Sequence, residues 1–337
     1  MIAGAPEQAR WICATPRRSL PADVLDRIVN TAFPGSRVVS CEPLAAGLRN
    51  ANFKLGLDNG PGPAVLRVYE HDPSLCRKEI DLARLVRGSV PTPEILYAAP
   101  DGVAGVPPYA IMRWEEGITF HELKRSGDGD AVAQAARAAG EVLAAIGRFA
   151  FSRPGWIAPG PAVTAPLLDG ADAMPRFIDL CLAAGNLQRR VPDDLRHRTR
   201  DFVWRCAPLY GSLESEAHLV HGDFNKRDLL VRRRGGQWTI AAVLDWEFAV
   251  SGSPLADIGS FLRYERQAQP LIEPHFCAGC QSAGGKLQDG WRRLARLLNL
   301  VALCESLTHD SLPPDVSAEL IELVRFTIEE SRSDGRG

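Results

Sequence analysis

Residues 218–248 read HLVHGDFNKRDLLVRRRGGQWTIAAVLDWEF, and this stretch carries the strongest indication of the fold. Asp223 sits in a His-Gly-Asp turn directly after a short apolar strand, and Asp228 follows it. A second apolar run, residues 240–244, ends at Asp245. If the intervening chain returns on itself, both strand ends lie at one mouth, and the three carboxylates face a common space.

Three carboxylates in this order suit one type of chemistry. Phosphoryl transfer needs a carboxylate that orients and deprotonates the attacking hydroxyl, and two oxygen ligands that hold Mg²⁺ on the phosphates. Taken singly, Asp223 would be an ordinary turn residue and Asp245 an ordinary strand terminator. Their order and separation favour a functional set.

The stretch resembles the catalytic core of the aminoglycoside phosphotransferase family, which belongs to the wider protein-kinase-like superfamily. That family reads His-Gly-Asp-x-x-x-x-Asn and later has an Asp-Trp-Glu strand end. The resemblance implies an α+β, bilobal protein-kinase-like fold with a small antiparallel-sheet N-lobe and a larger, mostly helical C-lobe, at residues 1–116 and 117–337. It also implies Asp223 as the catalytic base, with Asp228 and Asp245 as Mg²⁺ ligands.

One residue departs from the family pattern, because Asp228 stands where the family has Asn. An Asp can bind Mg²⁺ as an Asn does, and its added negative charge tightens metal binding while it repels the nucleotide phosphates. The departure leaves open an alternative in which the chain is a catalytically impaired, nucleotide-binding pseudokinase.

The expected nucleotide-binding half lies upstream. A turn containing Gly47, Asn50 and Asn52 resembles the family's phosphate-covering loop, although such a turn is often a plain hairpin. Arg67 lies in the middle of an apolar strand, where kinases carry the lysine that grips the phosphates. Glu79 falls on the next helix, where the family places the acid that pairs with this cation. The alternatives are an outward-facing edge-strand charge and a solvated Glu.

Residues 92–117 read as two strands around a Pro/Gly loop. The resemblance makes this the hinge between the lobes, where backbone groups meet the adenine edge, and the hinge candidates are Met112, Arg113, Trp114 and Glu115. Apolar periodicity and helix-start signals predict helices at 22–32, 73–87, 130–150, 193–209, 290–307 and 314–332.

Two further residues near the motif are expected to be structural. Asp257 either caps the next helix or bonds to the backbone of the catalytic loop. His221 resembles the kinase loop histidine, which orders the loop and does no chemistry.

Composition adds limits on partners. The net charge of −2 predicts no nucleic-acid partner, and the sequence shows neither a long apolar stretch for a membrane span nor a secretory signal. The basic run at residues 232–234 precedes Gly235-Gly236 and reads as a solvated loop. Eight scattered cysteines, including the Cys277/Cys280 pair, are expected to be free thiols in a reducing cytosol.

These observations predict a cytoplasmic enzyme, a monomer or weak homodimer, that moves the γ-phosphoryl group of ATP (or GTP) with Mg²⁺ to a small molecule. By family analogy the acceptor is a hydroxyl of an aminoglycoside-like or other cationic antibiotic, and the reaction confers resistance. A polycation needs acids in its cleft, and the candidates are Asp257, Glu265, Glu305 and Asp310. The alternative is a metabolite kinase acting on choline, homoserine, a fructosamine or a sugar.

Overall fold

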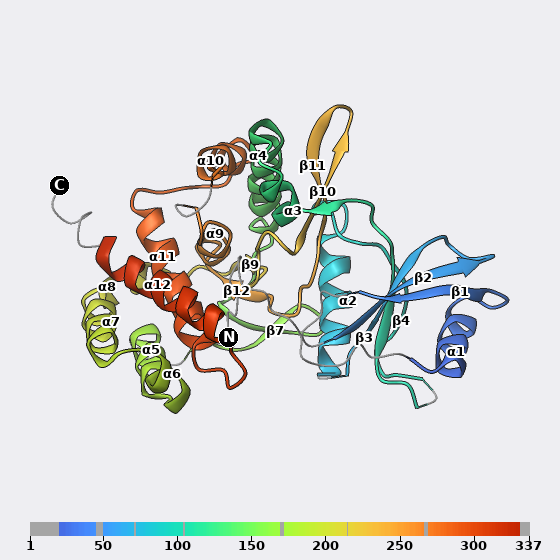
Figure 1. Cartoon of the computed structure of the whole chain (residues 1–337), viewed down its shortest axis with the longest axis horizontal. Helices are drawn as coiled ribbons and strands as arrows, with labels where there is room; N and C mark the ends of the chain where they lie inside the picture. The colour runs from blue at the N-terminus through green and yellow to red at the C-terminus, as the bar shows by residue number, and fades with distance from the viewer. Residues whose placement is uncertain are drawn as a thin grey trace.

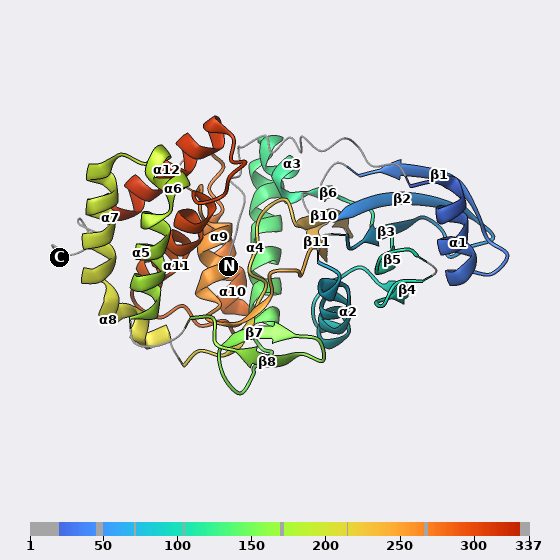
Figure 2. The same cartoon turned by 90° about the horizontal axis from the view of Figure 1, so that it is seen from below.

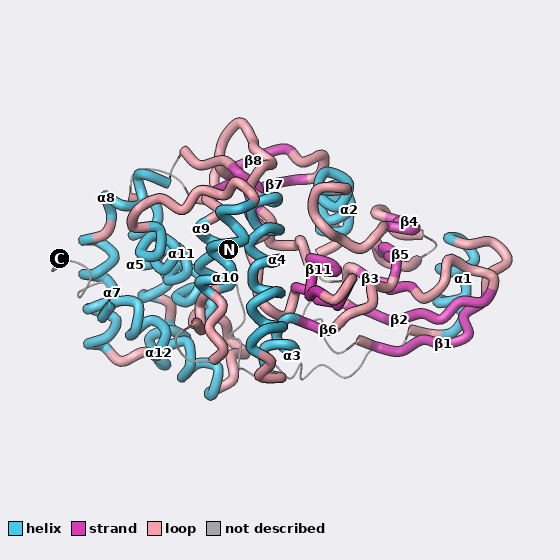
Figure 3. The backbone as a smooth tube through the Cα atoms, turned by 90° about the horizontal axis from the view of Figure 1, so that it is seen from above, coloured by secondary structure: helices cyan, strands magenta, loops and turns pink. Residues whose placement is uncertain are grey.

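The computed structural model describes residues 20–44, 50–70, 72–103, 105–168, 172–213, 215–265 and 269–330. One part of the molecule holds the five-stranded sheet and the other holds most of the helices, with helix α2 (Ser74–Val86) beside the junction (Figures 1 and 3). This arrangement confirms the expected α+β, bilobal fold with a mostly helical C-lobe. The lobe boundary between residues 116 and 117 stays a prediction.

The N-lobe is built on an antiparallel sheet of five strands in the order β1-β2-β3-β5-β4. Phe53 and Leu55 alternate inward on their strand, and the amphipathic helix α1 (Ala22–Ala32) covers them with Ile28. The predicted helix at 22–32 is therefore confirmed. The strand bounds are β1 (Arg37–Pro43), β2 (Ala51–Asp58), β3 (Ala64–Val68), β4 (Ile95–Ala99) and β5 (Tyr109–Arg113).

A hairpin beside the lobe junction carries the chain from Asp228 to Asp245. Its strands are β10 (Leu229–Arg234) and β11 (Gln237–Val243), and the short strand β6 (Ile118–Thr119) pairs with β10 as the chain enters the C-lobe. Gly235 and Gly236 have φ of 59° and 86°, as a tight two-residue hairpin turn requires. The prediction that residues 232–234 form a loop is wrong, because they continue β10 in register with β11.

The two apolar strands expected around the catalytic loop belong to different sheets. The first is β9 (His218–Val220), which pairs with β12 (Val250–Gly252) in a four-stranded sheet of order β8-β7-β12-β9. The second is β11. Their ends still meet, because Leu244 N–H donates to the carbonyl of Asp228 at 2.8 Å. The other strands of this sheet are β7 (Gly155–Ala158) and β8 (Ala162–Ala165).

Helices fill the rest of the C-lobe, and α4 (Gly129–Ile146) packs closely on α10 (Glu273–Ser282). A Cβ on Gly140 would lie 2.0 Å from the Phe276 carbonyl oxygen, so only glycine allows this approach. The predicted helices are present, although the one expected at 130–150 ends at Ile146 and the one expected at 193–209 ends at Arg205. Further helices are α3 (Phe120–Arg125), α5 (Ala173–Ala183), α6 (Gly185–Arg190), α7 (Asp193–Arg205), α8 (Ala207–Tyr210), α9 (Leu255–Phe261), α11 (Trp291–Ser306) and α12 (Pro314–Glu330). Among the described helices, none has both the length and the apolar character needed to cross a bilayer.

Candidate active site

Helix α9 holds the loop of residues 221–228, which joins β9 to β10. The buried carboxylate of Asp257 accepts hydrogen bonds from the backbone N–H groups of His221 and Gly222, at 2.7 and 2.9 Å. Asp257 therefore bonds to the loop backbone, which is the second of its two expected roles. Gly222 has a φ of 85°, and a Cβ there would lie 2.3 Å from the Phe248 carbonyl oxygen, so this turn needs glycine.

His221 orders the loop and is fully buried. Its Nε2 lies 2.9 Å from the Leu244 carbonyl oxygen, so Nε2 carries the proton, and Nδ1 accepts from the Asp223 N–H at 3.3 Å. Burial lowers the pKa of His221 to about 4, which keeps the ring neutral near pH 7. Both ring nitrogens have backbone partners, which fits an ordering role.

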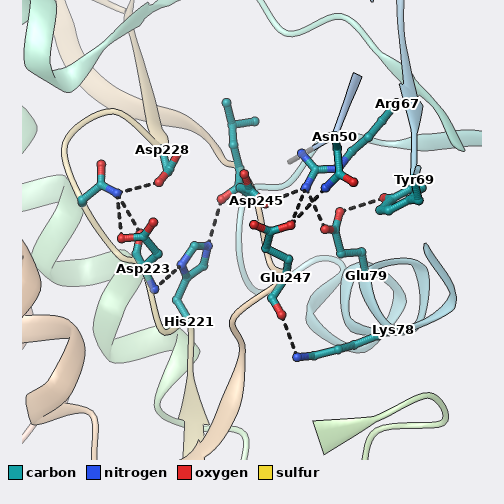
Figure 4. A network of polar contacts seen from close by, with 12 residues as sticks. Asn50, Arg67, Tyr69, Lys78, Glu79, His221, Asp223, Asp228, Asp245 and Glu247 are labelled. Atoms are coloured by element: carbon teal, nitrogen blue, oxygen red, sulfur yellow. Dashed lines mark hydrogen bonds and ion pairs between the residues drawn. The ribbon is translucent and has the colours of Figure 1, made fainter. Parts of the chain in front are cut away.

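Asp223 and Asp228 are brought together by one side chain, Asn225. Its amide Nδ2 donates to Asp223 Oδ1 at 3.0 Å and to Asp228 Oδ2 at 2.6 Å (Figure 4). Burial raises the pKa of Asp223 to about 7. Burial, and then the charges of Asp223 and Asp245, raise the pKa of Asp228. Burial and neighbouring carboxylates thus favour the protonated form of both side chains when no cation is bound.

Asp245 lies next to this pair but has a different partner. Its backbone φ is 63°, in the left-handed region, and its Oδ1 accepts from Arg67 Nη2 at 2.6 Å. The same Arg67 nitrogen donates to Glu79 Oε1 at 2.9 Å and lies 3.6 Å from Glu247 Oε2 (Figure 4). Although burial alone would lower it, the carboxylates of Glu79 and Asp245 raise the pKa of Arg67.

The expected convergence of carboxylates is therefore only partly present. Among the described residues, the carboxylate oxygens that lie mutually within 4.8 Å are those of Glu79, Asp245 and Glu247, with the Arg67 guanidinium bonded to them. Asp223 and Asp228 do not join that group. The ion pair expected between Arg67 and Glu79 is present, and Tyr69 also donates to Glu79 through its hydroxyl at 2.8 Å.

Glu247 ties both lobes to the end of β11. Its carboxylate accepts from Asn50 Nδ2 at 3.0 Å, and its backbone carbonyl accepts from Lys78 Nζ at 2.8 Å (Figure 4). Both Asn50 and Lys78 are buried N-lobe residues. Burial lowers the pKa of Lys78 to about 8. Asn50, from the turn predicted to cover the phosphates, and the helix that carries Glu79 are thus attached to the same C-lobe residue.

The other residues that are predicted to bind the nucleotide make fewer side-chain contacts. Asn52 pairs with Arg67 across β2 and β3, and Gly47 falls outside the described residues. In the hinge, Met112 and Arg113 end β5. The N–H groups of Arg113 and Trp114 donate to the carbonyls of Glu94 and Pro63, at 2.8 and 3.1 Å.

These bonds bear on the hinge prediction. The N–H groups of Arg113 and Trp114 are already used within the N-lobe. Recognition of an adenine edge by the other backbone groups of Met112 to Glu115 stays a prediction.

Sequence reasoning missed three residues of this network, namely Lys78, Asn225 and Glu247. Asn225 and Glu247 stand inside the quoted motif, two residues after Asp223 and Asp245 respectively. That shared spacing was the available signal. Lys78 gave none, because a Lys beside Arg77 on a helix is usually solvated.

Comparisons with known proteins identify the family and the fold. A family model described as "Phosphotransferase enzyme family" matches residues 40–297. A search of curated proteins gave no match.

Among solved structures, the crystal structure of aminoglycoside phosphotransferase APH(4)-Ia aligns with a TM-score of 0.68 at 18% identity, covering 92% of this chain and 99% of that one. A thermostable mutant of it, in a ternary complex with AMP-PNP and hygromycin B, aligns with a TM-score of 0.67 at 19% identity, covering 91% and 98%. The GDP and kanamycin complex of APH(2")-IIia gives 0.66 at 19% identity, covering 91% and 99%. At this identity the structures show a shared kinase-like fold. Because the family match spans more than half of the chain, the protein belongs to the phosphotransferase enzyme family.

Proposed function

We propose that this enzyme transfers the γ-phosphoryl group of ATP or GTP to a hydroxyl group of a small molecule. Asp223 accepts the hydroxyl proton while the oxygen bonds to the γ-phosphorus, and the bond from that phosphorus to the β-phosphate bridge breaks, which releases the nucleoside diphosphate. The main support is that the loop of Asp223 and Asp228 lies beside the network of Asp245, Arg67 and Glu79 at the lobe junction (Figure 4).

The nucleotide side of the proposal rests on the N-lobe. Arg67 neutralises the phosphates and Glu79 holds its side chain, which is supported by their buried ion pair. Gly47, Asn50 and Asn52 cover the phosphates, and the hinge at Met112, Arg113, Trp114 and Glu115 meets the base. Relatives of the same fold were solved with AMP-PNP or GDP, which supports a nucleoside triphosphate as donor.

Mg²⁺ fits the residues at the lobe junction. Burial and neighbouring carboxylates raise the pKa of Asp228, so a cation there relieves a repulsion that the protein leaves in place. We assign Asp228 and Asp245 as its ligands, with Arg67 and the ion competing for Asp245, which now bonds to the guanidinium. When bound, Mg²⁺ neutralises charge on the β- and γ-phosphates.

The acceptor class is a separate matter, because the same core serves more than one acceptor. A cationic antibiotic is supported by the relatives solved with hygromycin B and kanamycin, and resistance would follow from its modification. A metabolite kinase of the choline, homoserine, fructosamine or sugar type would use the same Asp223, Asp228 and Asp245.

We further propose a cytoplasmic monomer or weak homodimer with no nucleic-acid or membrane partner. The near-neutral charge of −2 supports the absence of a polyanion partner. The described cysteines, Cys277 and Cys280 among them, are free thiols, which a reducing compartment favours.

The test is nucleoside diphosphate release, measured by a coupled assay over a panel of hydroxyl compounds with ATP or GTP and Mg²⁺. Asp223→Asn should lower kcat by about 10²- to 10⁴-fold, because a positioned base contributes that much. Asp201→Asn, at an exposed position of α7, is the matched control and should leave kcat unchanged. Retained turnover in Asp223→Asn would show that Asp223 is not the base.

A further inference from the structure

The loop of residues 221–228 is fixed to the interior of the C-lobe on both sides of Asn225. Phe224 is fully buried in the hydrophobic core, and the buried Lys226 donates through Nζ to the Phe261 carbonyl oxygen at the end of α9. Figures 1 and 2 show α9 inside the C-lobe, with α11 on one side and α4 on the other. All residues of this helix are buried, so the backbone of Asn225 is held by well-packed neighbours.

The side chain of Asn225 has one defined orientation. Its Oδ1 accepts from the backbone N–H of Arg227 at 2.7 Å. Because an N–H group can donate only to the amide oxygen, this bond distinguishes the two ends of the amide. Nδ2 therefore faces the acids, where it donates to Asp223 Oδ1 at 3.0 Å and to Asp228 Oδ2 at 2.6 Å (Figure 4). It also lies 3.2 Å from the Asp223 carbonyl oxygen.

Each of the two acids uses one carboxylate oxygen for Asn225 and keeps the other. Within the part of the chain that the structure describes, neither Asp223 Oδ2 nor Asp228 Oδ1 accepts a hydrogen bond. A carboxylate that is bonded through one oxygen has a fixed orientation, and its second oxygen stays available as an acceptor or a ligand. Asn225 thus determines which oxygen of each acid is available.

An amide suits this position because it donates without a positive charge. A cationic donor between the two acids would compete with a metal ion for them, as Arg67 does at Asp245. A carboxylate at the same position would offer no donor and would add a third acid. Asn225 therefore holds both acids and leaves them accessible to a cation.

Resting on the function proposed above, we propose that Asn225 is a positioning residue for phosphoryl transfer. It fixes one oxygen of Asp223 and one of Asp228, so that Asp223 Oδ2 remains for the acceptor hydroxyl and Asp228 Oδ1 remains for the metal ion. Asn225 acts through these two acids. Its effect on the rate comes from their orientation, because a misplacement of about 1 Å can cost about 10²-fold in rate.

Asn225→Asp isolates this role, because Asp has the same size and still accepts from the Arg227 N–H. The substitution places an oxygen where Nδ2 now lies, so both acids lose their common donor and gain an acidic neighbour. We expect kcat at saturating nucleotide and Mg²⁺ to fall by about 10²-fold. The KM for nucleotide should change less than kcat does, because the hydrogen bonds of Asn225 stay within the loop.

Exchange of the two side chains provides the decisive comparison. In Asn225→Asp/Asp228→Asn, the amide at position 228 can donate to the acid at position 225, and the loop again carries one amide and two acids. We expect the exchange to regain at least about tenfold of the lost kcat. The effect of Asp228→Asn on kcat should therefore differ by at least about tenfold between the natural chain and Asn225→Asp. A purely structural role for Asn225 would not produce this difference.

The melting temperature without nucleotide or Mg²⁺, measured at pH 8, gives a readout that needs no activity. Asn225→Asp should lower it by about 2–4 °C because both acids lose their donor, and the exchange should restore part of the loss. If Asn225→Asp fails to fold, Asn225→Ala removes the donor without adding an acid and should still lower kcat at least about tenfold.

Asn59→Asp is the matched control, since it makes the same substitution at an exposed turn of the N-lobe. It should change neither kcat nor the effect of Asp228→Asn. An unchanged kcat in Asn225→Asp, or an effect of Asp228→Asn that is the same in both backgrounds, would overturn the proposal.

The proposed function is judged on the natural chain. Slow nucleotide hydrolysis without an acceptor, abolished by Asp223→Asn, reports the phosphotransfer site itself. Absence of both hydrolysis and transfer in the natural chain refutes the function and, with it, the role of Asn225. Turnover that Asn225→Asp leaves intact refutes the positioning role alone.

Discussion

Glu79→Gln tests whether the buried network at the lobe junction holds Arg67 for nucleotide binding. The substitution keeps the size of the side chain and its ability to accept from the Tyr69 hydroxyl. It removes the charge that faces Arg67 Nη2 at 2.9 Å. Both side chains of this ion pair are nearly buried, with exposed fractions of 8% and 11%.

The expected cost follows from the contacts. A hydrogen bond to a charged group contributes about 1.5–3 kcal/mol when it is removed alone. Burial raises the pKa of Glu79 despite Arg67, so desolvation of its carboxylate offsets part of that gain. In the variant, Arg67 also keeps its contacts with Asp245 Oδ1 at 2.6 Å and with Glu247 Oε2 at 3.6 Å. We therefore expect a loss of about 1–2 kcal/mol in the free energy of unfolding.

We expect Glu79→Gln to weaken nucleotide binding more than it lowers the free energy of unfolding. Without Glu79, the guanidinium is drawn toward Asp245 and Glu247, so we expect the KM for nucleotide to rise about tenfold or more. Urea unfolding measures the free energy of unfolding, and steady-state kinetics measure the KM for nucleotide.

The control is Asp101→Asn, which breaks the exposed ion pair of Asp101 with Arg77 in the same lobe and should cost about 0–1 kcal/mol with unchanged KM. An unchanged KM in Glu79→Gln, or a cost no larger than that of the control, would refute the assigned role.

Three further predictions concern the catalytic loop. Burial raises the pKa of Asp223 to about 7, and the protonated acid cannot accept another proton, so kcat/KM measured from pH 5.5 to 9 should rise with pH and level off above about 7; a flat profile contradicts this. Asp228→Asn removes a negative charge, so the Mg²⁺ concentration that half-saturates the rate should rise about tenfold. Turnover at saturating Mg²⁺ should stay within about tenfold of that of the natural chain. A far larger gain in turnover would mark the natural chain as catalytically impaired. Gly222→Ala should lower stability by about 2 kcal/mol more than Gly236→Ala in urea unfolding, because both have positive φ but only the first would place its Cβ 2.3 Å from a carbonyl oxygen; equal losses would exclude the clash as the cause.

Much of the fold was predictable from local pattern. Helix α1 occupies the predicted 22–32, and the helix carrying Glu79 begins within one residue of its prediction. The strand of Arg67 and the helix of Glu79 are only 12 residues apart, so their ion pair follows from neighbouring elements. Periodicity, glycine turns and helix starts are short-range properties, and they are encoded where they act.

Partners distant in the chain were decided by tertiary structure. Asn50 and Lys78 reach Glu247 across 197 and 169 residues, and no local pattern encodes which C-lobe residue faces them. The same holds for Asp245, whose carboxylate bonds to Arg67 rather than joining Asp223 and Asp228. Charge counts along the sequence left the acceptor open, since the 41 Asp and Glu residues nearly balance the 39 Lys and Arg residues. Packing of α9, α10 and α11 decided that Glu265 accepts from the backbone N–H groups of Ile272 and Glu273 and that Glu273 pairs with Arg292, because hydrogen bonding and ion pairing depend on which groups meet in space.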